Sequence, residues 1–120
     1  MHEGSITSSI IETVLDTLDS EGFDGPVESV HITVGVCQGL VPESMQMFFD
    51  MEKPGTRLEN AELKVAVQGI VARCPVCERE HELDVAVMYC PDCGAPMDMV
   101  RGDEIIITEI EVIDNGEHTG

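Results

Sequence analysis

Four of the five cysteines form two Cys-x-x-Cys motifs, Cys74-Pro-Val-Cys77 and Cys90-Pro-Asp-Cys93, which are separated by twelve residues. Four thiolates at this spacing can enclose one soft or borderline cation in a tetrahedral cage, and zinc is the cation that such a ligand set favours. A cage of four sulfurs leaves no open coordination position. We therefore expect the metal to shape the protein rather than to catalyse a reaction.

An iron site of the rubredoxin type would use the same four thiolates for redox chemistry, but few aromatic residues surround these motifs. His81 lies between the two motifs and is either a replacement ligand at low pH or a solvated loop histidine. Cys37 lies outside both motifs and is expected to be a small buried hydrophobe.

A second set of possible ligands is the start of the chain, Met1-His2-Glu3. Methionine is normally trimmed only before a small residue, so we expect Met1 to be retained. An α-amine titrates near 7.7 to 8.0 and histidine near 6.5, so both groups can offer neutral nitrogen at cellular pH. Nitrogen donors in small chelate rings suit Ni²⁺ or Cu²⁺ better than zinc. Glu3 can add its amide or its carboxylate.

The composition of the 120 residues limits the partners that the protein can have. Twenty-four acidic against six basic residues give a net charge of −18, which disfavours nucleic acids and anionic membrane surfaces. No apolar run reaches the roughly 20 residues of a membrane span, and the start lacks the features of a secretion signal. We expect a cytoplasmic protein whose core is built from Ile, Val, Leu and Met, because aromatic residues make up only 3%.

Apolar periodicity predicts two helices. The first runs from Ser5, as its N-cap, to about Ser20. The second begins at Pro42, a residue suited to the first helical position, and ends near Glu52.

Alternating or β-branched segments predict three strands at residues 30–36, 63–72 and 105–113. The first two strands flank a helix and should pair in parallel through a right-handed crossover. The expected fold is α+β: a small three-stranded mixed sheet with two helices on one face, plus an inserted four-cysteine zinc module.

This arrangement predicts three parts of the chain. Residues 1–72 with 100–114 form an α/β domain that carries the nickel-binding start, residues 73–99 form the zinc module, and residues 115–120 are a flexible tail.

Several of these features together resemble the HypA family, the nickel-insertion accessory proteins of [NiFe]-hydrogenase maturation. The resemblance covers nearly the whole chain. It rests on the Met-His-Glu start, Val34-Gly35, Val41-Pro-Glu-Ser44, Gly55-Thr56-x-Leu58-Glu59-x-Ala61-Glu62-Leu63, Cys90-Pro-Asp-Cys-Gly94 and Gly102-Asp-Glu-Ile-Ile-Ile107.

The resemblance implies a nickel site built from the Met1 amine, His2 and Glu3, and zinc on the four motif cysteines. It also implies two partners, a GTPase of the nickel pathway and the hydrogenase large subunit, while some relatives serve urease. The protein itself would be a monomer or a weak homodimer.

Two departures from the family pattern stand out. No histidine precedes the third strand, where some relatives have an additional nickel ligand, and Val36-Cys37 replace the Glu-Leu that commonly follows the glycine.

Two other classes of function compete with a nickel carrier. A zinc-ribbon adaptor would bridge proteins without carrying nickel. An enzyme is disfavoured because no nucleophile and base are evident and His31 has no evident partner in the sequence.

Overall fold

The computed structural model describes residues 2–83 and 88–113, so the predicted tail at 115–120 lies outside the described residues. The chain divides into two compact units. We call Met1–Ile32, Leu40–Val65 and Ile107–Gly120 the helical unit, and Thr33–Gly39 with Ala66–Ile106 the cysteine unit. The assignment of nickel and zinc binding to separate domains stays a prediction.

Helix α1 spans His2–Ser20, three residues more at its start than predicted. Ser5 is therefore inside the helix, and the prediction that it is the N-cap is wrong. Tertiary contacts explain the longer helix, because they stabilise the first turn more than local sequence does. The Glu3 carboxylate accepts a hydrogen bond from the Val41 N–H, and Gly4 lies against the ring of Phe48.

Helix α2 spans Pro42–Glu52, as predicted. Pro42 occupies the first turn, where a missing N–H costs nothing, and Met45 and Phe49 are fully buried. Lys53 closes the helix: its ammonium donates to the Ala61 carbonyl at 2.9 Å and lies 5.5 Å from the centre of the Phe49 ring. Within the described residues, no helix is both long enough and apolar enough to cross a membrane.

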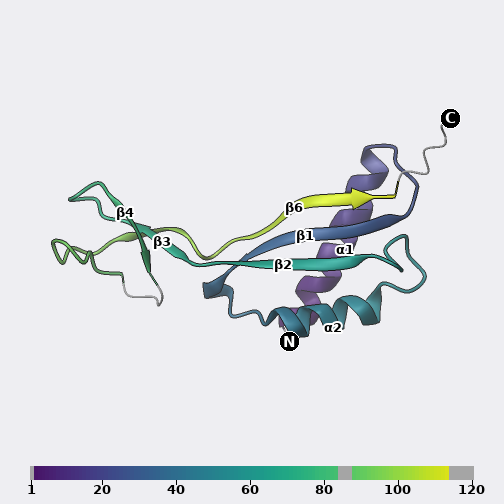
Figure 1. Ribbon diagram of the computed structural model, residues 1–120, viewed down its shortest axis with the longest axis horizontal. Helices are drawn as coiled ribbons and strands as arrows, with labels where there is room; N and C mark the ends of the chain where they lie inside the picture. Colours follow the sequence, from purple (N-terminus) through teal and green to yellow (C-terminus); the bar gives the residue numbers. More distant parts are fainter. Residues whose placement is uncertain (1, 84–87, 114–120) are drawn as a thin grey trace. The chain divides into compact units, whose positions relative to one another are not determined.

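The larger sheet contains β1 (Val27–Gly35), β2 (Glu62–Gln68) and β6 (Ile105–Val112) in the order β2-β1-β6 (Figure 1). Helices α1 and α2 contact each other and cover one face of this sheet. Alternate residues of β1 are buried beneath them, which explains the period-two pattern of the sequence. The predicted fold class, a three-stranded mixed sheet with two helices on one face, is confirmed.

Two backbone hydrogen bonds give the direction of β6. The Gly35 N–H at the end of β1 donates to the Glu104 carbonyl at 2.6 Å, and the Ile113 N–H donates to the Pro26 carbonyl at 3.0 Å. The end of each strand thus lies beside the start of the other, so β1 and β6 are antiparallel. Strand β1 is the central strand of this sheet, so its side chains can reach residues of β6.

A second sheet, which the sequence did not predict, belongs to the cysteine unit. It contains β3 (Ile70–Arg73), β4 (Glu80–Leu83) and β5 (Asp98–Arg101), with β3 antiparallel to both neighbours. The prediction of one strand over 63–72 is wrong because the chain leaves β2 at Gly69 and starts β3 in a different sheet. Strands β4 and β5 have four residues each and none of them is buried, so no burial pattern marks them in the sequence.

Gly35 and Gly102 make the closest backbone contact around a glycine in the described chain. A Cβ at Gly35 would lie 2.2 Å from the carbonyl carbon and oxygen of Gly102, and Gly102 itself has φ of 122°. Only a residue without a side chain fits at either position. The contact brings the end of β1 against the segment that leads into β6.

We expect Gly35→Ala to lower the free energy of unfolding by about 3 kcal/mol, because the obstructing atoms are backbone and cannot rotate away. Urea unfolding of the zinc-loaded protein measures this change. Gly69→Ala is the matched control, since a Cβ there meets no atom within 4 Å. Equal stability of the two variants would contradict the contact.

Candidate metal centres

The Sγ atoms of Cys74, Cys77, Cys90 and Cys93 all lie within 4.8 Å of one another. The Sγ atoms of Cys74 and Cys93 are 3.6 Å apart. Zinc–sulfur bonds of about 2.3 Å in a tetrahedron place the sulfurs about 3.8 Å apart. The sulfur spacing therefore fits one zinc ion, as the two motifs predict.

The two motifs fold into the same turn. In each turn the N–H of the residue after the second cysteine donates to the carbonyl of the first, at 2.7 Å for Glu78 to Cys74 and 2.8 Å for Gly94 to Cys90. Glu78 and Gly94 also share a positive φ, 60° and 77°. The first motif follows β3 and the second precedes β5, so pairing of these strands brings the turns together.

Backbone N–H groups also point at the sulfurs. The Cys77 N–H donates to Cys74 Sγ at 3.3 Å, and the Asp92 N–H donates to Cys90 Sγ at 3.4 Å. Because these donors favour the thiolate, the Cys77 N–H lowers the pKa of Cys74 to about 7, although burial opposes the shift. The cluster is therefore ready to lose its first proton near neutral pH.

The protons of Cys77 and Cys93 are held more tightly, since the pKa of each thiol is raised. The thiol of Cys77 shares a hydrogen bond with Cys93, and this contact, together with burial, raises the pKa of Cys77 to about 12. A cation that binds all four sulfurs must displace such protons. Metal binding at the cluster should therefore release protons and weaken as the pH falls.

His81 lies beside the cluster without being part of the four-sulfur set. Its Nε2 is 3.8 Å from Cys90 Sγ and 3.8 Å from a carboxylate oxygen of Asp92. His81 is on β4 opposite Ala72 and its side chain is only 18% exposed. The interpretation as a solvated loop histidine is therefore wrong, because strand pairing with β3 holds the ring against the cluster.

Cys37 lies in a short 3₁₀ turn, Val36–Gln38, directly after β1. The prediction that it is buried is wrong, because its side chain is exposed. The turn is held by its backbone instead: the Cys37 N–H donates to the Gly102 carbonyl at 2.8 Å. Backbone hydrogen bonding, and not burial among apolar side chains, therefore holds Cys37 in position.

At the start of the chain, Met1 and the side chain of His2 lie outside the described residues, whereas the backbone of His2 begins α1. The Glu3 carboxylate accepts a hydrogen bond from the Val41 N–H at 3.2 Å, immediately before α2. The first turn of α1 is thus attached to the start of α2. Nickel ligation by residues 1–3 stays a prediction.

His31 has a partner that the sequence did not reveal. Its Nε2 lies 3.0 Å from Glu111 Oε1 and 3.3 Å from Ser29 Oγ, and the Ser29 hydroxyl donates to the same Glu111 carboxylate. The Ser29 hydroxyl and then His31 lower the pKa of Glu111. The expectation that His31 has no partner is therefore wrong, because the pairing of β1 with β6 places Glu111 beside it.

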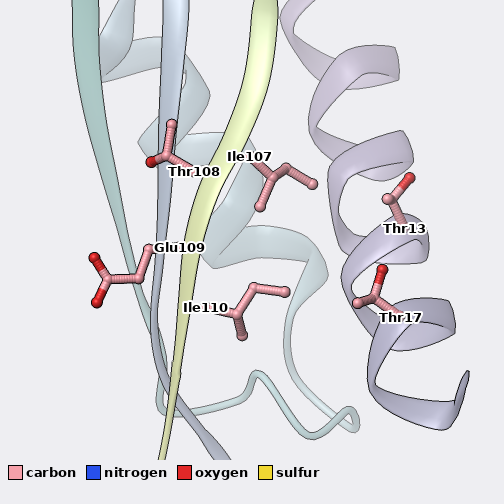
Figure 2. Close-up of a pocket in the computed structure, with 6 residues that line it drawn as sticks. All are labelled: Thr13, Thr17, Ile107, Thr108, Glu109 and Ile110. Atoms are coloured by element: carbon pink, nitrogen blue, oxygen red, sulfur yellow. The ribbon is translucent and has the colours of Figure 1, made fainter. Parts of the chain in front are cut away.

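A shallow hollow of about 370 Å³ lies between α1 and β6. Figure 2 shows Thr13 and Thr17 of α1 facing Ile107 and Ile110 of β6 across it. The described residues that line it include no histidine or cysteine. The hollow therefore offers no ligand set for a borderline metal ion.

Comparison with known proteins gives a consistent result over the length of the chain. The family profile described as "Hydrogenase/urease nickel incorporation, metallochaperone, hypA" matches residues 1–112. A guanidine hydrolase-activating protein A from Synechocystis sp. is 34% identical over 113 residues, covering 92% of this chain and 94% of that protein. A hydrogenase maturation factor HypA from Geobacter sp. is also 34% identical, covering 93% and 99%.

Solved structures share the fold. The solution structure of the Ni metallochaperone HypA from Helicobacter pylori has a TM-score of 0.68 at 16% identity, covering 92% of this chain and 97% of that chain. A second solution structure of a HypA protein has a TM-score of 0.71 at 17% identity, covering 94% and 97%.

Proposed function

Because this chain belongs to the HypA family of hydrogenase/urease nickel-incorporation metallochaperones, we propose that it binds Ni²⁺ through its N-terminus and delivers it to a nickel enzyme. The ligands in this proposal are the Met1 amine, the His2 imidazole and Glu3. The ion is cargo, so it has to be released as well as bound. A chain end that offers nitrogen donors suits that requirement better than a closed sulfur cage.

The main support for this proposal is the hydrogen bond that joins the first turn of α1 to Val41, the residue before α2. A frayed chain end would hold its donors at random, whereas α1 begins at His2 and Glu3 bonds to the Val41 N–H. The position of the backbone at residues 2 and 3 is thereby fixed by α2. A net charge of −18 further raises the local concentration of divalent cations.

The four cysteines supply the second half of the proposal. Zn²⁺ on Cys74, Cys77, Cys90 and Cys93 would be structural, because the cage has no open position and links β3 to β5. Nickel would leave by ligand exchange at the chain start while zinc stays in place. The cysteine unit would then present a constant surface to partners.

The proposed partners are a GTPase of the nickel pathway and the hydrogenase large subunit. The family description names nickel incorporation into hydrogenase and urease, and individual relatives are named for hydrogenase maturation or for guanidine hydrolase activation, so the client enzyme differs among relatives. The protein would act in the cytoplasm.

Acetylation of the α-amine tests the terminal site. We expect untagged, zinc-loaded protein to bind one Ni²⁺ per chain tightly, and the acetylated protein to lose that tight binding at equal zinc content, because an amide nitrogen is not basic. Isothermal titration at neutral pH measures both. Unchanged nickel affinity after acetylation would overturn the terminal site. Absence of tight nickel binding in both forms would favour a zinc-ribbon adaptor that bridges maturation partners.

A further inference from the structure

We propose that His31, Glu109 and Glu111 form a second, dissociable site for a borderline divalent cation, of the Ni²⁺ and Zn²⁺ class, on the sheet face that points away from α1. All three residues belong to the helical unit. The inference does not depend on the terminal nickel site, and its test is carried out with that site blocked.

The pairing of β1 with β6 brings these donors together. His31 lies in β1, and Glu109 and Glu111 lie two residues apart in the neighbouring β6. Figure 2 shows the side chain of Glu109 pointing away from α1, on the opposite side of β6 from Ile107 and Ile110. The ligand atoms of Glu111 and Glu109 lie within 4.8 Å of each other and of a ring nitrogen of His31, so the three donors share this face.

The distances suit a metal ion. One imidazole nitrogen and one oxygen from each carboxylate all lie within 4.8 Å of one another, and His31 Nε2 is 3.0 Å from Glu111 Oε1. Ligands at right angles around an ion with bonds of about 2.1 Å are about 3.0 Å apart. The His31–Glu111 pair therefore already has the spacing of two neighbouring ligands, and the carboxylate of Glu109 lies within 4.8 Å of both.

Neighbouring side chains hold two of the donors in place. Ser29 is 1% exposed and its hydroxyl donates to Glu111, while the Thr108 hydroxyl donates to the His31 carbonyl at 3.2 Å. Such supporting hydrogen bonds are what orient ligands in metal sites.

Glu109 distinguishes a cation site from a simple His–Glu pair. One carboxylate is enough to pair with His31, and a second carboxylate beside it adds repulsion unless a cation lies between them. Lys64 is close enough to lower the pKa of Glu111, but its side chain is 50% exposed and its ion pair with Glu62 is 3.9 Å long. When the cation binds, the proton on His31 Nε2 leaves for solvent or for Nδ1, and the freed lone pair becomes the ligand.

The test uses N-acetylated, zinc-loaded protein with Ni²⁺ alone as the probe. We expect paramagnetic Ni²⁺ to broaden first the amide signals of residues around 31 and 109–111, with Glu109→Gln weakening the affinity by about tenfold. Glu109 is exposed, so its substitution does not threaten folding. Glu28→Gln removes the same charge from an exposed position of β1 and should leave the affinity within twofold. His31→Ala should abolish the broadening at this face.

Two results would overturn the proposal. If Glu109→Gln and Glu28→Gln weaken binding equally, the attraction is only the general negative charge of the protein. If broadening centres on residues other than these strands, the cluster is a hydrogen-bonded pair and not a metal site. Either result leaves the terminal nickel site untouched, because the acetylated protein lacks it throughout.

Discussion

Serine in place of Cys74 is expected to release zinc and to unfold the β4-β3-β5 sheet. Cys74 is fully buried, and the buried cluster around it otherwise consists of Ala72, Cys90 and Met97. So small an apolar cluster cannot hold the short strands β4 and β5, which have no buried residue, since isolated short strands are marginal in water. Structural zinc contributes about 10 to 16 kcal/mol to the folding of zinc-finger peptides. Loss of zinc should therefore leave the β4-β3-β5 sheet disordered.

Zinc per chain by mass spectrometry and amide hydrogen exchange over residues 70–101 measure the two effects. Cys37→Ser is the matched control, because Cys37 is exposed and lies outside the sulfur cluster. The Cys37→Ser protein should keep both its zinc and its protection from amide hydrogen exchange. A Cys74→Ser protein that retains a full equivalent of zinc would contradict the four-sulfur site, unless the added change His81→Ala then removes the metal. That result would identify the nearby imidazole as the replacement ligand.

Elements that bury an apolar face could be predicted from the sequence. Helix α2 was predicted with its observed bounds, because Pro42 marks its start and Met45 and Phe49 face the core. Strand β1 alternates in burial and in sequence alike. In both cases local pattern and tertiary environment agree, which is the condition under which such reasoning succeeds.

Elements held by contacts remote in sequence could not be predicted. The first turn of α1 depends on Val41, and β4 and β5 depend on the sulfur cluster and on pairing with β3. Neither influence leaves a periodic signal near the residues concerned.

The candidate sites follow the same division. The cysteine cluster could be predicted because its ligands come in two pairs at fixed spacing. The group around His31 could not, because His31 and Glu111 are 80 residues apart and only strand register joins them. A histidine on a strand next to a Glu-x-Glu segment of another strand is the signal, and it has meaning only once the two strands are known to pair.

Alanine in place of His2 should abolish tight nickel binding and leave zinc content and fold unchanged. The imidazole is the proposed donor that no neighbouring group can replace in the same chelate ring. Alanine has the highest helix propensity, and Glu3 would still accept the hydrogen bond from the Val41 N–H. Loss of nickel would thus report a lost ligand rather than a lost helix.

Nickel titration of zinc-loaded His2→Ala protein, followed by calorimetry and circular dichroism, measures both parts of this expectation. His118→Ala makes the same chemical change in the C-terminal segment and should bind nickel as the parent does. Any weak binding left in His2→Ala should disappear when His31→Ala is added, if the strand site accounts for it.

Protons compete for an amine with a pKa near 7.7 to 8.0 and an imidazole near 6.5, so tight binding in the parent should weaken as the pH falls from about 8 to 6. Full nickel affinity in His2→Ala, or binding that does not weaken with acid, would mean that the ion is held by other ligands, and delivery from the chain start would have to be abandoned.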